Sequence, residues 1–152
     1  MRGKLFRVFK DLCLIVLMGF MYMGIEVLWR GRTSIFMGLV GGTCGLLIGE
    51  LNEHSAFYVR KMWEQSLIGT LITLAIEFIS GVILNIWWKL DIWDYSGMYG
   101  NILGQICIPY AFLWFLLMPT AVFVDDWLRY KLFKEEKPSG LISNYISLFT
   151  LK

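Results

Sequence analysis

Charged residues are scarce in this sequence, and so are the groupings of residues that bind metals or nucleic acids. Only 17% of the residues are charged and the formal net charge is +2, so the strongly basic surface of a nucleic-acid-binding protein is absent. The three cysteines (Cys13, Cys44 and Cys107) and the single histidine, His54, lie far apart in the sequence. This spacing excludes a Cys/His metal site and predicts that the cysteines are buried packing residues. No metal and no cofactor are expected.

Motifs for catalysis are missing as well. The glycine-rich stretch at 41–45 lacks the Lys-Ser/Thr pair of a phosphate-binding loop, and no His-Glu-x-x-His motif of a zinc protease occurs. With one histidine at the edge of an apolar segment, no Ser/His/Asp arrangement is convincing. The apolar run that begins at Leu12 has no suitable cleavage site after it, so no cleavable signal peptide is predicted. We therefore expect a protein that is not an enzyme.

Hydrophobic residues are abundant instead, at 57% of the chain, with a mean hydropathy of +0.61. Soluble domains usually contain about 45–50% apolar residues. Crossing the hydrocarbon core of a membrane takes roughly 20 apolar residues in a helix, and four segments reach or approach that length: 12–29, 34–49, 66–88 and 102–124. The sequence thus predicts an all-α, polytopic membrane protein with a bundle of four transmembrane helices.

The distribution of positive charge predicts the orientation of this bundle. With four spans, both termini and the loop at 50–65 share one side of the membrane. That side carries eleven of the fourteen Lys and Arg residues, and the other carries Arg30, Arg32 and Lys89. Because positive residues are enriched in cytoplasmic loops, we expect both termini in the cytoplasm.

The segment after the fourth span alternates charged and apolar residues, and its apolar residues share one helical face. This pattern predicts a cytoplasmic amphipathic extension of the fourth helix over 125–137, at the membrane interface. Residues 1–137 would then form one transmembrane domain. Pro138-Ser139-Gly140 ends it, and 138–152 is expected to be a short tail that docks on the membrane or on a partner. Pro109 and Pro119 are expected to kink the fourth span.

Five glycines occupy the short second segment, 34–49. Gly41, Gly45 and Gly49 lie four residues apart on one helical face, and Gly38 and Gly42 repeat the spacing beside them. Small residues at this spacing let the backbones of membrane helices approach closely. We predict a tightly packed second helix, with a re-entrant hairpin as the alternative.

Glu77 lies at the midpoint of the third segment, near the expected centre of the bilayer. A carboxyl group at that depth is costly, so such residues normally face a bundle interior, a cavity or a partner. Thr73 and Asn85 recur on the same side of the helix. Two interpretations are open: a protonated Glu77 that only stabilises packing through hydrogen bonds, or a proton- or cation-coupled site.

The outer loop between the third and fourth segments is rich in aromatic and acidic residues. Asp94, Tyr95 and Ser96 lie within it, Asn101 ends it, and Gln105 is placed one turn into the fourth helix. These side chains could hold a ligand, or they could cap the flanking helices, with Asn101 as the N-cap of the fourth.

Charged residues at the other span ends are expected to be structural. Glu26 and Arg30 are four residues apart near the outer end of the first span, which favours an ion pair. The polar run 50–54 after the second span is expected to be a solvated interfacial segment.

Several motifs resemble those of a known family. They are Glu77-Phe78-Ile79-Ser80-Gly81, Trp93-Asp94-Tyr95-Ser96 and Gly100-Asn101-x-x-Gly104-Gln105. On these residues the chain is similar to the putative ABC-transporter type IV membrane proteins of Firmicutes, also called putative ABC transporter permeases. Its first half resembles the short members from clostridial genomes and prophages. The resemblance covers roughly residues 19–115 and implies a permease-like protein of the bacterial cytoplasmic membrane.

Three functions fit these observations. The first is a permease-like or channel-like protein that moves a small solute or cation past Glu77, as an oligomer, because four short helices rarely enclose a pore alone. The second is a non-transporting subunit or receptor module that docks a membrane partner, and the third is a holin-like phage lysis protein. The candidate substrate- or ion-binding residues are Glu77, Thr73, Asp94, Tyr95, Ser96, Asn101 and Gln105.

Overall fold

The computed structural model of the chain describes residues 2–53 and 61–151, and its regular elements are helices. They are α1 (Arg2–Arg30), α2 (Ile35–Glu53), α3 (Met62–Gly81), the π-helical turn η1 (Val82–Trp87), α4 (Ile108–Phe133) and α5 (Leu141–Phe149). Four stretches are long and apolar enough to cross a membrane: Gly3–Arg30, Ile35–Glu53, Met62–Trp87 and Ile108–Phe133. The predicted all-α, four-span architecture is confirmed.

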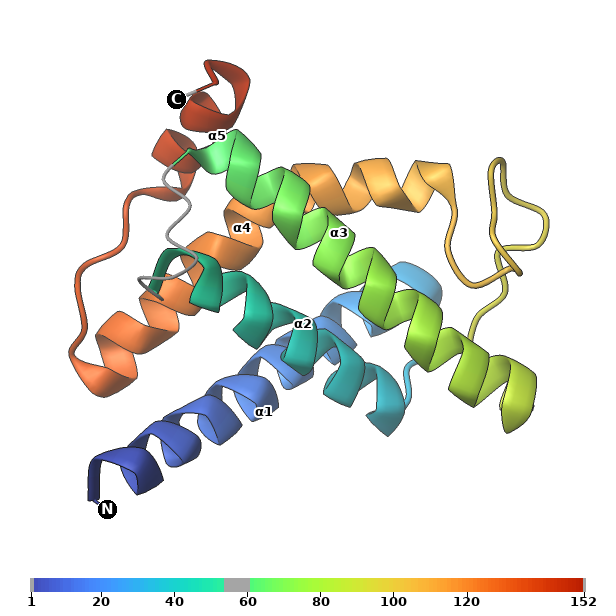
Figure 1. Cartoon of the computed structure of the whole chain (residues 1–152), viewed down its shortest axis with the longest axis horizontal. Coiled ribbons are helices and arrows are strands. Elements are labelled where there is room, and N and C mark those ends of the chain that lie inside the picture. Colours follow the sequence, from blue (N-terminus) through green and yellow to red (C-terminus); the bar gives the residue numbers. More distant parts are fainter. Residues whose placement is uncertain (1, 54–60, 152) are drawn as a thin grey trace.

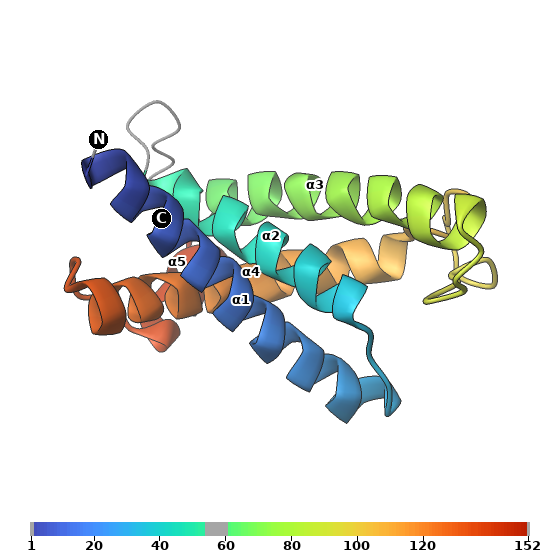
Figure 2. The same ribbon diagram turned by 90° about the horizontal axis from the view of Figure 1, so that it is seen from below.

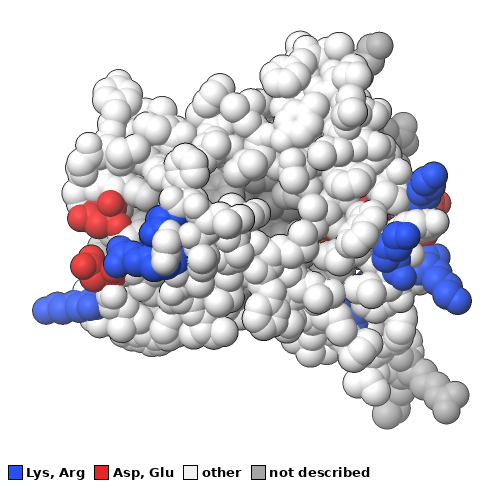
Figure 3. Space-filling model, turned by 180° about the vertical axis from the view of Figure 1, so that it is seen from behind, with Lys and Arg blue, Asp and Glu red and all other residues white. Residues whose placement is uncertain are grey.

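In Figure 1 the directions of α1 and α4 cross those of α2 and α3, and in Figure 2 α1 and α2 are inclined to α3 and α4. Both ends of the chain lie at one end of the bundle, and the α1–α2 connection and the loop after η1 lie at the other (Figure 2). On the face in Figure 3, charged side chains gather at the two ends, separated by an uncharged band with a hollow near its centre. A surface of this kind suits a protein whose middle contacts lipid.

The fourth helix begins later than predicted. Residues 102–107 are a turn closed by an isolated bridge between Ile102 and Ile106, and α4 starts at Ile108 with Cys107 as its N-cap. The prediction of Asn101 as a helix cap is therefore wrong, and Gln105 lies in the loop. Pro109 falls in the first turn of α4, where its missing N–H costs no hydrogen bond, whereas Pro119 lies inside the helix.

The fourth helix also continues past the predicted span, as expected, and ends at Phe133 because Lys134 adopts the left-handed conformation (φ 59°). The tail then contains a helix of its own, α5, which returns to pack on α3 and α4. Tyr145 Oη donates to the carbonyl of Leu116 (3.0 Å) and Asn144 Nδ2 to that of Pro119 (3.3 Å). The tail thus covers polar backbone atoms of α4.

Close contact between α1 and α2 depends on glycine. A Cβ at Gly42 would collide with the backbone carbonyl of Ile15, and one at Gly19 would collide with the carbonyl of Gly38. Gly41 and Gly45 make room for the side chains of α1 instead. The structure has a continuous helix here, not a re-entrant hairpin, and its glycine faces lie mainly against α1.

We expect Gly42→Ala to lower the free energy of unfolding by about 1–3 kcal/mol. The added methyl group would collide with the backbone carbonyl of Ile15, which cannot move aside as a flexible side chain could, so α1 and α2 would have to separate. Gly24→Ala in α1 is the matched control, since a Cβ there meets nothing within 4 Å. Reversible unfolding in mixed micelles, followed by tryptophan fluorescence, measures both. Equal stability of the two variants would contradict the close approach of α1 and α2.

Candidate functional site

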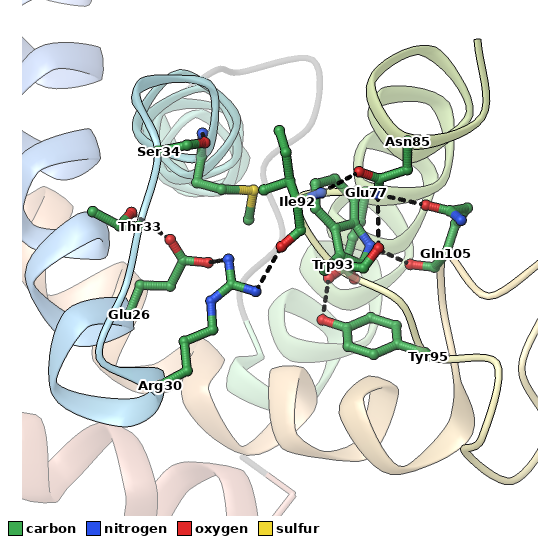
Figure 4. Close-up of polar contacts among 11 residues, drawn as sticks. Glu26, Arg30, Thr33, Ser34, Glu77, Asn85, Ile92, Trp93, Tyr95 and Gln105 are labelled. Carbon is green, nitrogen blue, oxygen red and sulfur yellow. Dashed lines mark hydrogen bonds and ion pairs between the residues drawn. The ribbon is translucent and has the colours of Figure 1, made fainter. Parts of the chain in front are cut away.

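Glu77 is buried in the middle of the bundle, with 3% of its surface exposed. Its carboxyl oxygens accept one hydrogen bond each, from Tyr95 Oη and from Trp114 Nε1, both at 3.2 Å. Tyr95 comes from the outer loop (Figure 4) and Trp114 from α4, so the carboxyl group joins three separate segments. None of the ion pairs among residues 2–53 and 61–151 includes Glu77.

A cavity of about 140 Å³ lies beside this carboxyl group. All four spanning helices contribute to its wall, which is apolar apart from a few side chains. Tyr22 of α1 and Trp114 of α4 both line it, and their rings stack on each other with centroids 6.0 Å apart. The polar lining residues are Tyr22, Thr73, Glu77 and Thr120, together with the thiol of Cys44.

Thr73 lies one turn before Glu77 on α3 and is buried. Its hydroxyl neighbours the Cys44 thiol and is without a hydrogen bond to any nitrogen or oxygen in the described part of the chain. The structure therefore places Thr73 and Glu77 in the wall of one cavity and brings the hydroxyl of Tyr95 onto the carboxyl group of Glu77. These three come from the set of seven candidate site residues.

Gln105 has a different position, because it anchors the outer loop. Its side-chain oxygen accepts from Asn85 Nδ2 (2.8 Å), and its backbone carbonyl accepts from Trp93 Nε1 (3.0 Å). Asn85 also binds the loop backbone at Ile92 and Trp93 (Figure 4). Asn85 belongs to η1, whose wider turn ends α3. Trp93 and Gln105, both 4% exposed, form a plug over the end of the bundle opposite the two termini.

The remaining candidates, Asp94, Ser96 and Asn101, stabilise a turn on the surface. Asp94 accepts hydrogen bonds from the backbone and hydroxyl of Ser96, and these lower the pKa of its carboxyl group. Asn101 Nδ2 donates to the carbonyls of Ser96 and Met98 (3.0 Å each). The turn orients Tyr95 inward. Burial raises the pKa of the Tyr95 hydroxyl far above its usual value, so this group stays protonated and donates.

The ion pair between Glu26 and Arg30 is present and has a further role. Glu26 also accepts from Thr33 Oγ1 (2.5 Å), which fixes the turn between α1 and α2. Arg30 Nη1 donates to the carbonyl of Ile92 (3.1 Å). Arg30 thus connects α1 to the same loop that delivers Tyr95 (Figure 4).

A buried charge cluster lies at the opposite end of the bundle, and the sequence did not indicate it. Arg129, 1% exposed, binds Asp125 (2.5 Å) on its own helix and Glu50 (3.0 Å) of α2. Gly49 makes room for Asp125, because a Cβ there would overlap its carboxylate. Lys10 of α1 binds Glu135 (2.7 Å) nearby. The four-residue spacing of Asp125 and Arg129 is visible in the sequence, but it also fits the amphipathic pattern of an interfacial helix. His54 lies outside the described residues.

The comparisons with known proteins place the chain in a family. The model of the putative ABC-transporter type IV family matches residues 36–150. The chain belongs to this family. The match extends beyond the resemblance seen at 19–115, through α4 and α5, and begins after α1. No curated protein and no solved structure matches the chain.

Removal of the indole donor in Trp93→Phe leaves the buried carbonyl of Gln105 without its partner, which typically costs about 1–3 kcal/mol. We expect faster amide hydrogen exchange across residues 88–107, measured by mass spectrometry in micelles. Trp87→Phe is the control, because Trp87 is 71% exposed. Unchanged exchange in Trp93→Phe would contradict the anchoring of the loop.

Arg129→Met leaves Asp125 buried without a counter-charge, a change that typically costs about 3–5 kcal/mol. We expect a large loss of stability in unfolding measurements, and partial recovery when Asp125→Asn is added. Lys131→Met on the exposed side of the same helix should have little effect. A loss in Lys131→Met as large as that in Arg129→Met would refute this account.

Proposed function

We propose that this member of the family is a permease-like protein that moves a small solute or cation through a site at Glu77. The observation that carries the proposal is a buried carboxyl group beside a cavity, hydrogen-bonded to two neutral donors and to no cation among the described residues. A carboxyl group in a membrane interior normally pairs with a partner or marks a pathway. A bound cation or cationic solute would supply the positively charged partner that Glu77 lacks among the described residues.

The two ends of the cavity support a mechanism with alternating access. Trp93 and Gln105 cover the outer end, and buried Leu14, Met18 and Leu128 pack below it. A solute could pass only if these contacts open in turn. We further propose that the protein acts as an oligomer, because one copy encloses only a small cavity, and that it is not an enzyme.

The proposed setting is the cytoplasmic membrane of a bacterium, with both termini in the cytoplasm. The arrangement supports this because the termini share one end of the bundle (Figure 2). In this orientation the charge cluster at Arg129 lies at the cytoplasmic side and the loop with Tyr95 at the outer side.

A second candidate function is a non-transporting subunit that docks a membrane partner. It is favoured by the closure of both ends and by α5, whose residues Ile142, Ile146 and Phe149 are exposed and apolar. In that case Glu77 would only join Tyr95 and Trp114 and so hold the outer loop on the helices.

Flux in proteoliposomes separates the two. With a panel of cations, anions and a pH-sensitive dye, we expect wild-type flux that falls at least about tenfold in Glu77→Gln, because the amide keeps the shape but cannot carry the charge. Glu64→Gln on the same helix is the matched control. If wild type carries no solute while both variants fold normally, transport is refuted and the subunit function is favoured.

A further inference from the structure

The cavity beside Glu77 reaches the lipid-facing surface between α1 and α4. Met21 and Ile25 of α1 line it and are 45% and 61% exposed, and Leu117 of α4 lines it and is 38% exposed. In the membrane these side chains border hydrocarbon. A molecule dissolved in the bilayer could therefore enter from the side, past flexible Met and Leu side chains.

Entry from the outer aqueous phase is blocked in this conformation. The ring of Tyr95 stacks on that of Tyr110, with centroids 4.7 Å apart, and its hydroxyl occupies one oxygen of Glu77. Above it lies the plug of Trp93 and Gln105. The largely apolar wall also offers few groups to replace the hydration shell of an inorganic cation: Glu77, the hydroxyls of Tyr22, Thr73 and Thr120, and the thiol of Cys44.

The polar groups that face the cavity have unused capacity. A carboxylate has about four acceptor positions, and Glu77 uses two for neutral donors in the described structure. The buried hydroxyl of Thr73 is an additional donor or acceptor. The stacked rings of Tyr22 and Trp114 supply aromatic surface of the kind that attracts ammonium groups.

We propose that the cavity binds a small apolar amine taken up from the bilayer, with its ammonium group on Glu77 and its short hydrocarbon part against Tyr22, Trp114 and Met18. The volume of about 140 Å³ fits this, because an engineered apolar cavity of about 150 Å³ holds benzene. The inference rests on the proposed site at Glu77 and specifies the class of substrate that the site takes.

Photolabelling tests the proposal with the full chain in lipid vesicles. The probe is a short alkyl diazirine with a primary amine, and its matched neutral analogue is the corresponding alcohol. After irradiation, mass spectrometry locates the attached label. We expect the amine to label segments 18–25 and 114–124 and to be displaced by excess hexylamine, and the alcohol to label them at least about tenfold less.

Two variants test the contacts separately. Glu77→Gln should lower this labelling at least about tenfold by removing the charge. Ala121→Leu should do the same by filling the cavity while leaving Glu77 intact, and Ala75→Leu, on the exposed side of α3, is its matched control. Equal labelling in all variants, or by amine and alcohol alike, would mean simple partition into the bilayer and would overturn the proposal.

The outcome is independent of the flux experiment. Flux of an inorganic cation that depends on Glu77, without amine labelling, would overturn the proposed substrate class and leave transport in place. Labelling that depends on Glu77, without flux of the amine or of any other solute, would support the binding site and remove the transport function.

Discussion

Inside a bilayer no water is available to satisfy polar groups, so each one must find a partner within the protein. Much of this structure follows from that constraint. The amide of Asn85 and the indole of Trp93 hold an irregular loop at the end opposite the termini, and side chains of α5 reach two carbonyls of α4. At the other end, the buried guanidinium group of Arg129 pairs with the carboxylates of Asp125 and Glu50. Glu77 differs from the buried carboxylate of Asp125, because both of its hydrogen-bond donors are neutral and a cavity lies next to it.

The constraint also explains why glycine is concentrated in α2. Without a hydrophobic driving force between helices, packing must come from close contact of backbones. Gly42 allows this contact with α1, whereas Gly49 has another purpose and makes room for the carboxylate of Asp125. The same residue type, at the same spacing on one helix, therefore supports both packing and the burial of charge.

The sequence was sufficient to predict the four spans and the burial of Glu77, because a long apolar run needs lipid around it and a lone carboxyl group within that run must turn away from the lipid. It could not show that only Thr73 and Tyr95 among the other candidates surround Glu77. Thr73 lies one turn from Glu77 on the same helix, but the position of Tyr95 depends on where the loop before α4 folds back. Asp94, Ser96 and Asn101 have the chemistry of a binding site but form a turn. The pairing of Arg129 with Glu50 joins distant segments, and no local pattern indicates it.

The wall of the cavity comes partly from the segment that matches the family and partly from α1, which lies outside the matched residues. The segment that matches the family supplies the carboxyl group and three walls, while α1, which precedes the matched region, supplies the fourth with Met18, Met21, Tyr22 and Ile25. Changes confined to α1 could reshape the space without touching Glu77. The first helix is therefore the part of the chain through which the shape of this chamber can be altered while the chemistry of its carboxyl group stays the same.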